Sequence, residues 1–255
     1  MDKRENSKMS GQIRVTREKT ASCIQIYRPE KKNAFTPEMY EAMSAAIRSA
    51  DADDTVRVIV LHGIDGCFTS GNDLKNLRNG PSVDRIYPHN LYIDALYHAQ
   101  KPVIAAVSGI SLGIGTIMLF HCDFVYATPD ARFSLPFVNL GLSPEGGTSY
   151  ILPHLIGYQK AAELIMLGEK FDSQLAERIG LVNAIVPPEE LLDKALDTAA
   201  RLAGKSAESL RSAKVLLRQG MRDAVTTAMS RELDLFNERL ASPDVAMAID
   251  RFFKK

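Results

Sequence analysis

The stretch KPVIAAVSGISLGIGTIML, residues 101–119, couples an apolar run to closely spaced glycines. The run PVIAAV has the length of a buried strand, and its valines and isoleucine favour that conformation. The glycines that follow let the backbone turn sharply, and the apolar pattern after them is typical of a helix. Serine and glycine interrupt the run repeatedly between residues 108 and 115, which excludes a membrane span. We therefore expect a buried strand, a glycine turn and a helix here.

The same alternation extends outward along most of the chain. Strand-like runs are expected at residues 12–17, 22–27, 56–62, 103–107, 124–127 and, more weakly, 181–186. Helical patterns lie between them: one opens at Thr36 and Pro37, a good N-cap and first-turn pair, and others are expected near 85–99 and 113–121. Strands that alternate with helices predict an α/β domain with a largely parallel sheet.

The chain changes character after residue 186. Strand signals end there, and helical patterns are expected over residues 190–203, 207–219, 224–240 and 243–253, the last with Ser242 as its N-cap. The polar start lacks the apolar segment of a signal peptide. We therefore expect a flexible N-terminal tail (1–10), an α/β core (11–186) and a C-terminal helical cap (187–255).

Composition excludes several classes of partner. The chain has 255 residues, of which 45% are hydrophobic and 24% charged, and its formal net charge is +0. Such a balance offers no basic surface to nucleic acid or to an anionic membrane. Cys23, Cys67 and Cys122 are far apart and odd in number, so we expect no disulfide framework or zinc site and a reducing, cytoplasmic location. The histidines show no metal-ligand spacing, so no metal site is expected.

Glu145 lies in an unusual setting for a carboxylate. In NLGLSPEGGTS, residues 139–149, it stands between Pro144 and two glycines, with leucines just before it. A carboxylate is costly to bury unless a partner or a task keeps it there. One interpretation is a solvated turn, in which Ser143 caps a helix that begins at Pro144. The other is a lone general base at the wall of a pocket, and these residues alone leave both open.

Two glycine-led turns share a pattern. The segment CFTSGNDL, residues 67–74, follows one apolar strand, and Gly113-Ile114-Gly115 follows another. Each strand runs into glycine and then a helix start, so backbone N–H groups from the two turns can point at one oxygen. The alternatives are two ordinary turns, or a G-x-S-x-G nucleophile elbow around Ser111. The elbow lacks a well-placed histidine, because His121 falls within the following helix and His154 comes unusually early.

In their order and spacing these segments resemble the enoyl-CoA hydratase/isomerase (crotonase) superfamily, from about residue 13 to residue 253. The matching segments include RPEKKNAFTPEMYEAM, VRVIVLHG, FTSGNDL, KPVIAAVSGISLGIGTIML and CDFVYATPDARFSLPFVNLGLSPEGGTSYILPHLIG. The resemblance implies a crotonase-like spiral of ββα units, a homotrimer or dimer of trimers formed through the C-terminal cap, and acyl-CoA thioester substrates. It implies no separate cofactor, because coenzyme A is part of the substrate.

The resemblance also implies roles for individual residues. The backbone N–H groups of Asn72 and Ile114 would hold the thioester oxygen of the substrate. The residues implied to contact coenzyme A are Lys32, Asn33, Ala34, Ser70, Phe252 and Lys255. The residues that we expect to line the acyl pocket are Phe68, Leu74, Ile117, Phe133, Phe137 and Leu140.

Two positions depart from the hydratases of the superfamily. Those enzymes use two glutamates, and this chain has Ile117 and Phe137 at the corresponding places. The segments GNDL and SPEGG resemble instead the Δ3,Δ2-enoyl-CoA isomerase branch, in which one glutamate moves the proton. We therefore expect Glu145 to catalyse the shift of a 3-enoyl-CoA double bond to the conjugated 2-enoyl-CoA. The open alternatives are hydration, thioester hydrolysis or ring-intermediate isomerisation of an acyl-CoA, and a homologue that binds acyl-CoA without catalysis.

Overall fold

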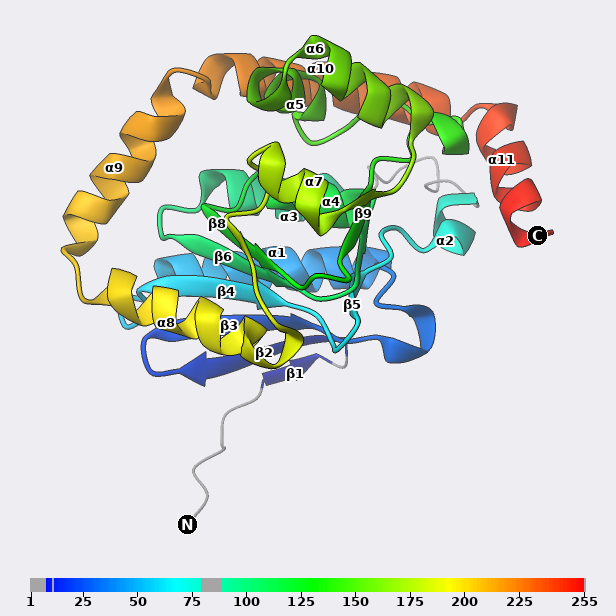
Figure 1. Ribbon diagram of the computed structural model, residues 1–255. Helices are drawn as coiled ribbons and strands as arrows, with labels where there is room; N and C mark the ends of the chain where they lie inside the picture. The colour runs from blue at the N-terminus through cyan, green and yellow to red at the C-terminus, as the bar shows by residue number, and fades with distance from the viewer. Residues whose placement is uncertain (1–7, 11, 79–88, 255) are drawn as a thin grey trace.

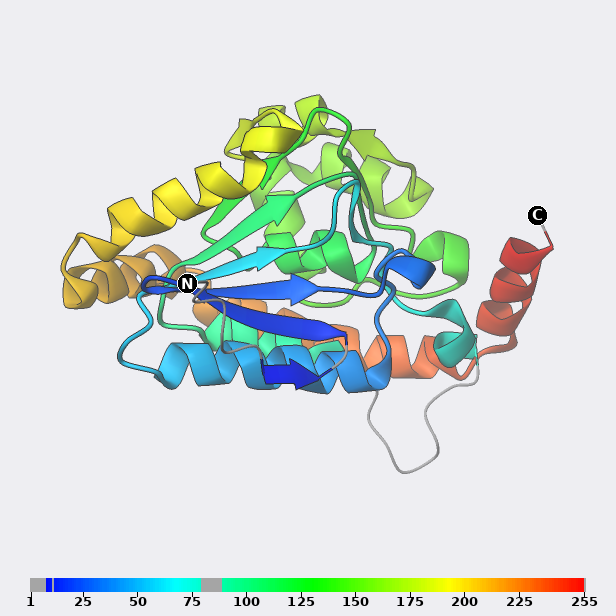
Figure 2. The same ribbon diagram turned by 90° about the horizontal axis from the view of Figure 1, so that it is seen from below.

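The computed structural model describes residues 8–10, 12–78 and 89–254, and it contains two sheets (Figures 1 and 2). The larger sheet has the order β1-β2-β3-β4-β6-β8-β11, and the smaller has the order β10-β9-β7-β5. Pairing in the larger sheet is antiparallel from β1 to β3 and parallel from β3 to β11. The strands are β1 (Lys8–Ser10), β2 (Ile13–Glu18), β3 (Ala21–Ile26), β4 (Val58–His62), β5 (Cys67–Thr69), β6 (Val103–Val107), β7 (Ile110–Leu112), β8 (Phe124–Ala127), β9 (Arg132–Ser134), β10 (Phe171–Asp172) and β11 (Ala184–Ile185).

Helices surround the sheets and dominate the second half of the chain. They are α1 (Pro37–Ala52), α2 (Leu74–Arg78), α3 (His89–His98), α4 (Ile114–Leu119), α5 (Thr148–Ile156), α6 (Tyr158–Ala162), α7 (Ser173–Arg178), α8 (Leu191–Ala203), α9 (Ala207–Gln219), α10 (Arg222–Leu240) and α11 (Pro243–Phe253), with a π-helix at Glu163–Leu167 and 3-10 turns at Pro29–Lys31, Val138–Leu140 and Pro188–Glu190. The expected caps are present. The side chain of Thr36 accepts from the N–H of Met39, and that of Ser242 accepts from the N–H of Asp244.

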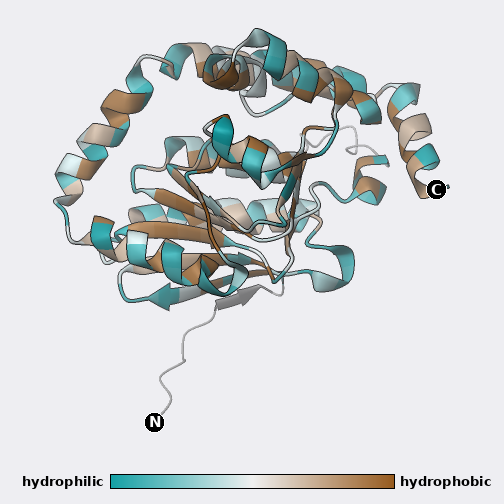
Figure 3. Cartoon of the chain, viewed as in Figure 1, coloured by the Kyte–Doolittle hydropathy of each residue, from teal (hydrophilic) through white to brown (hydrophobic). Residues whose placement is uncertain are grey.

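The central strands β4 and β6 of the larger sheet are buried on both faces. In β4, Ile59 and Leu61 belong to an apolar cluster that includes side chains of α1 and α3. Val58 and Val60 point the other way, into a second cluster with Leu191 and other residues of α8. Figure 3 shows the resulting concentration of hydrophobic residues along the central strands. Burial on both faces explains why these strands appear in the sequence as continuous apolar runs.

Three of the inner strands of the larger sheet each continue into a short strand of the smaller one. Thus β4 leads to β5 and α2, β6 leads to β7 and α4, and β8 leads to β9. The corner between β6 and β7 requires Gly109, whose φ is +61° and whose added Cβ would lie 1.8 Å from the carbonyl oxygen of Gly66. This repeated passage confirms the expected spiral of ββα units.

The C-terminal helices wrap around the core (Figure 1). Helix α8 packs on the larger sheet, α10 packs against α5, and α11 packs against α2 and the turn at Val138–Leu140. An ion pair of 2.7 Å between Arg78 and Asp250 joins α2 to α11. Within the part of the chain that the structure describes, no helix has the length and apolarity needed to cross a membrane.

Three features differ from the expectations. The smaller sheet was not predicted, because strands of two or three residues are too short to show a hydrophobic period. Lys8–Ser10, expected within a flexible tail, pairs with β2. Helix α5 begins at Thr148 after Gly147, so no helix starts at Pro144. The rest of the expected tail, the first part of the expected helix at 85–99, and Lys255 lie outside the described residues.

Candidate active site

The two glycine-led turns touch each other. Strands β5 and β7 are parallel neighbours in the smaller sheet, with Thr69 opposite Ser111. Gly71 follows β5 with a φ of +90°, and an added Cβ would lie 2.7 Å from the carbonyl oxygen of Leu112. Gly113 follows β7 with a φ of +54°. Glycine is therefore required at Gly71 both by its backbone conformation and by the close approach of the second turn.

Asn72 and Ile114 each direct a backbone N–H group away from the surrounding secondary structure. Phe35 brackets Asn72 from one side, because its N–H donates to the carbonyl of Gly71 (2.8 Å) and its carbonyl accepts from Asp73 (2.9 Å). In such a parallel bridge the N–H of Asn72 points to the opposite side. Ile114 is the first residue of α4, where N–H groups lack an intrahelical partner. Among the described residues neither N–H donates a hydrogen bond, so both are available to a ligand.

Glu145 is buried beside the second of these turns. Its side chain is 2% exposed, which rules out the solvated-turn interpretation. The next residue, Gly146, packs so tightly against α4 that an added Cβ would lie 2.5 Å from Cγ2 of Ile117. Burial, and after it the negative charge of Glu145, raise the pKa of the Tyr92 hydroxyl well above its usual value. Glu145 therefore lies close to both α3 and α4.

Three side chains hold the backbone that follows Glu145. Glu232 of α10 accepts from the N–H groups of Gly147 (2.5 Å) and Ser149 (2.7 Å). On the other side, Nε2 of His121 donates to the carbonyl of Gly146 over 2.8 Å. The hydroxyl of Thr148 donates to the carbonyl of Glu145 itself over 2.6 Å. The Glu145 loop is thus fixed from the core and from the C-terminal helices at once.

Neither Glu232 nor His121 was assigned to this loop from sequence. Glu232 falls among the buried positions of α10, together with Val225, Phe236 and Leu240. A carboxylate among the apolar positions of one helix face was the sequence signal that could have identified Glu232 as buried. Burial raises the pKa of Glu232, and the neighbouring charge of Glu145 adds to that effect. The two N–H groups counter it by stabilising the carboxylate form.

His121 predicts a loss of stability in mild acid. Burial lowers the pKa of His121 from 6.5 to about 4. Between these pH values the unfolded chain binds a proton that the folded chain does not, so the free energy of unfolding falls as the pH is lowered through this range. The difference between the two pKa values corresponds to roughly 3 kcal/mol in the free energy of unfolding. His121→Gln keeps a donor for Gly146 but does not titrate. Urea unfolding at about pH 7 and about pH 4.5 should therefore show a smaller fall in the free energy of unfolding for this variant than for wild type. Equal losses in both proteins would contradict this.

Four of the six residues expected to contact coenzyme A form one edge next to the first turn. Lys32 and Asn33 adopt left-handed backbone conformations, with φ of 50° and 56°. The buried side chain of Asn33 donates to the carbonyls of Cys67 and Phe68, each at 3.0 Å. The N–H of Ser70 donates to the carbonyl of Lys32 over 2.9 Å. The structure thus brings Lys32, Asn33, Ala34 and Ser70 together, whereas Phe252 is 59% exposed near the end of α11.

The six residues expected to line the acyl pocket belong to one apolar cluster. Phe68, Ile117, Phe133 and Phe137 are buried, and Leu74 and Leu140 are partly buried against them. The ring of Phe133 stacks on Phe171 of β10 with ring centroids 5.5 Å apart. Of the six, Ile117 packs directly against the Glu145 loop, through Gly146. The role of the six residues in binding an acyl chain stays a prediction.

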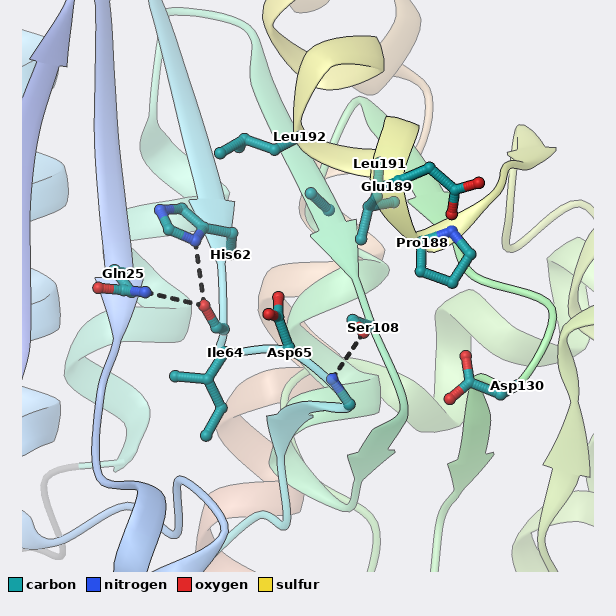
Figure 4. A pocket seen from close by; sticks show the side chains of 13 residues that line it. Gln25, His62, Ile64, Asp65, Ser108, Asp130, Pro188, Glu189, Leu191 and Leu192 are labelled. Atoms are coloured by element: carbon teal, nitrogen blue, oxygen red, sulfur yellow. Dashed lines mark hydrogen bonds between the residues drawn. The ribbon is translucent and has the colours of Figure 1, made fainter.

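A separate cavity of about 770 Å³ lies near the carboxyl ends of β4 and β6 (Figure 4). The carboxylates of Asp65, Asp130 and Glu189 stand around it, and His62 and Gln25 both donate to the carbonyl of Gly63. Among the described residues, none of those expected to bind coenzyme A or the acyl group lines it. Its negative rim would repel the phosphates of coenzyme A, so we do not place the substrate there.

The nucleophile elbow is not formed around Ser111. Its side chain is fully buried within β7, and among the described residues its hydroxyl has no hydrogen-bond partner. A serine nucleophile needs a base within hydrogen-bond reach and an open approach for the substrate. His121 is engaged with Gly146, and His154 is engaged with the carbonyl of Tyr150. The interpretation of Ser111 as a hydrolase nucleophile is therefore wrong.

Known proteins related to this chain include both hydratases and isomerases. The family model for enoyl-CoA hydratase/isomerase matches residues 16–255. A probable enoyl-CoA hydratase of Rhizobium meliloti (strain 1021) is 34% identical over 233 residues, which cover 91% of each chain. Enoyl-CoA delta isomerase 2 of Homo sapiens is 31% identical over 248 residues, which cover 94% of this chain and 63% of that protein.

Solved structures agree with this relationship. The structure of Pseudomonas aeruginosa OdaA superposes with a TM-score of 0.93 at 40% sequence identity, and the match covers 96% of this chain and 100% of that one. The shared fold extends over nearly the whole length of both chains, and the family match includes the segments that form the glycine turns and the Glu145 loop. The chain therefore belongs to the enoyl-CoA hydratase/isomerase family.

Proposed function

We propose that this protein is an acyl-CoA isomerase that converts a 3-enoyl-CoA to the conjugated 2-enoyl-CoA. The observation that carries the proposal is the combination of one buried carboxylate with two apolar positions. Glu145 is 2% exposed beside the turn that presents Ile114. Ile117 and Phe137, which occupy the places of the two hydratase glutamates in the resemblance, are buried and cannot carry a proton.

The reaction needs one base and one stabilised oxygen. The carboxylate of Glu145 would remove a proton from C2 of the 3-enoyl thioester while the electrons of that bond move toward the thioester carbonyl. Negative charge then develops on the thioester oxygen, where the N–H groups of Asn72 and Ile114 would stabilise it; one such donor is worth roughly 3–4 kcal/mol. The carboxylic acid of Glu145 then gives the proton to C4, which leaves the double bond between C2 and C3.

Hydration would need more than this site offers. A hydratase must activate water and must also deliver a proton to the substrate, which takes a second acid–base group. Glu232 is a second buried carboxylate near Glu145, but both of its oxygens accept backbone N–H groups of the loop. Its position therefore supports a role in holding the loop.

The proposal includes the mode of substrate binding and the assembly. Coenzyme A would lie along the edge formed by Lys32, Asn33, Ala34 and Ser70, as part of the substrate and without a separate cofactor. Leu216 and Leu217 of α9 are 68% and 80% exposed. Apolar side chains exposed in this way are commonly covered by another subunit, which supports the expected homotrimer or dimer of trimers.

The proposed shuttle predicts the fate of the migrating hydrogen. With 3-enoyl-CoA in deuterated water, we expect 2-enoyl-CoA that retains much of the original C2 hydrogen at C4, because one carboxylate carries it within a site closed to water. Mass spectrometry of the product measures this retention. The same protein offered 2-enoyl-CoA should form 3-hydroxyacyl-CoA far more slowly. Formation of 3-hydroxyacyl-CoA or free coenzyme A as the main product would favour hydration or thioester hydrolysis instead.

A further inference from the structure

Three nearly parallel aromatic rings contact one another beside the two glycine turns. The rings of Phe35 and Tyr40 lie 4.9 Å apart with 9° between their planes. Those of Tyr40 and Tyr92 lie 5.3 Å apart at 11°, and those of Phe35 and Tyr92 lie 5.6 Å apart at 6°. All three side chains are fully buried. Tyr40 comes from α1 and Tyr92 from α3, so the rings lie where these two neighbouring helices pack together.

Each tyrosine hydroxyl reaches one of the two residues that carry the free N–H groups. The hydroxyl of Tyr40 donates to Oδ1 of Asn72. The hydroxyl of Tyr92 donates to the carbonyl oxygen of Ile114 over 3.0 Å. The backbone of Phe35 forms the bridge that brackets Asn72. Tyr40 and Phe35 are therefore linked to Asn72 in the first turn, and Tyr92 is linked to Ile114 in the second.

We propose that Tyr40 and Tyr92 are positioning residues that hold the N–H groups of Asn72 and Ile114 at their working separation. These N–H groups belong to segments more than forty residues apart in sequence, and oxyanion stabilisation requires both to point at one oxygen. A stacked pair of buried rings has few conformations, so it can transmit a constant distance from one turn to the other. This inference rests on the proposed function, because it assigns these N–H groups to the thioester oxygen.

Tyr40 and Tyr92 would make the same hydrogen bonds if they only stabilised the fold, because buried tyrosine hydroxyls generally need a partner. Tyr126 provides the comparison. It is 6% exposed and its hydroxyl shares a hydrogen bond of 2.8 Å with Thr198 of α8, in the second apolar cluster. Tyr126→Phe removes one buried hydroxyl outside the residues placed at the site. Any effect that Tyr40→Phe or Tyr92→Phe shows beyond Tyr126→Phe reports on the turns.

The test compares wild type with Tyr40→Phe, Tyr92→Phe, the double variant and Tyr126→Phe. Turnover is measured on 3-enoyl-CoA. A second readout is the absorption maximum of bound 3-phenylpropenoyl-CoA, which has no hydrogen on C4 and cannot be isomerised. Hydrogen bonds to its thioester oxygen polarise the conjugated system and move the absorption to longer wavelength, so this shift measures the two donors without any chemistry.

We expect each site variant to lower kcat roughly ten-fold, with KM changed less than about two-fold, and to reduce the absorption shift. The double variant should lose less than the product of the single losses, because the stacked rings act together. Tyr126→Phe should leave kcat and the shift at the wild-type values. The proposal is overturned if the site variants match Tyr126→Phe in both readouts. If they reduce the shift while Glu145→Gln retains full turnover, the proposed reaction fails and the positioning role stands.

Discussion

Glu145→Gln is expected to lower isomerisation of 3-enoyl-CoA about a thousand-fold, which is within the range of rate enhancement that a positioned acid–base group supplies. Glutamine has the size of glutamate, so the loop packed against Ile117 can keep its structure. It cannot take a proton from C2 or return one to C4. Glu232 accepts from the N–H groups of Gly147 and Ser149, and His121 donates to the carbonyl of Gly146, so neither depends on the replaced carboxylate. The loss should therefore appear in kcat, whereas binding of acyl-CoA changes only a few-fold.

A second substitution separates chemistry from packing at this position. Glu145→Asp retains a carboxylate but withdraws it by one methylene group, so its reach to C2 and C4 is reduced. We expect an intermediate activity, because proton transfer depends on hydrogen-bond distance. Circular dichroism and calorimetric binding of acyl-CoA serve as controls for folding and for substrate affinity. Turnover by Glu145→Gln within a few-fold of wild type would remove Glu145 from the mechanism.

Asp123→Ala is expected to lower the free energy of unfolding by about 3–5 kcal/mol. Asp123 accepts from Nζ of Lys214 (2.7 Å) and from the guanidinium of Arg218 (3.2 Å), which attach α9 to the core. It also accepts from the backbone N–H of Val103 over 2.8 Å. The side chain of Lys214 is only 8% exposed. Burial lowers the pKa of Lys214, and the charge of Asp123 opposes that effect, so the substitution leaves a buried ammonium group without its carboxylate.

Two controls identify the cause of this loss in urea unfolding. Adding Lys214→Met to Asp123→Ala removes the unpaired charge and should restore part of the lost stability. Glu163→Gln breaks an exposed ion pair with Lys160, whose atoms also lie 2.7 Å apart, and should change the free energy of unfolding by less than about 0.5 kcal/mol. A loss of that small size in Asp123→Ala would show that the buried network contributes little.

Elements with strong local signals were predicted from sequence. The apolar runs at residues 103–107 and 124–127 form β6 and β8, because strands buried on both faces need apolar side chains throughout. Helices α1 and α11 begin where Thr36 and Ser242 predicted caps. Such signals act over a few residues and do not depend on the rest of the fold. The smaller sheet has no comparable local signal, because strands such as β7 derive their stability from neighbouring strands.

The candidate site was predictable only as a set of residues. The resemblance named Asn72 and Ile114 for their backbone N–H groups and Glu145 for its carboxylate. Tyr40 bonds to Asn72, and Glu232 bonds to the loop that follows Glu145. Neither had an assigned role, because a hydrogen bond between distant segments leaves no local pattern.

Local sequence alone therefore established the main strands of the larger sheet, the C-terminal run of helices, the glycines at the two turns, and the absence of a titratable side chain at Ile117 and Phe137. Whether Glu145 faces water or the core was decided by the tertiary structure, which buries it near α3 and α4 in a loop that Glu232 of α10 holds. The pairing of β5 with β7 likewise decided that the turns of Asn72 and Ile114 touch. The physical reason is that conformational preference is a property of neighbouring residues, whereas burial and the meeting of distant backbone groups arise only when the whole chain packs.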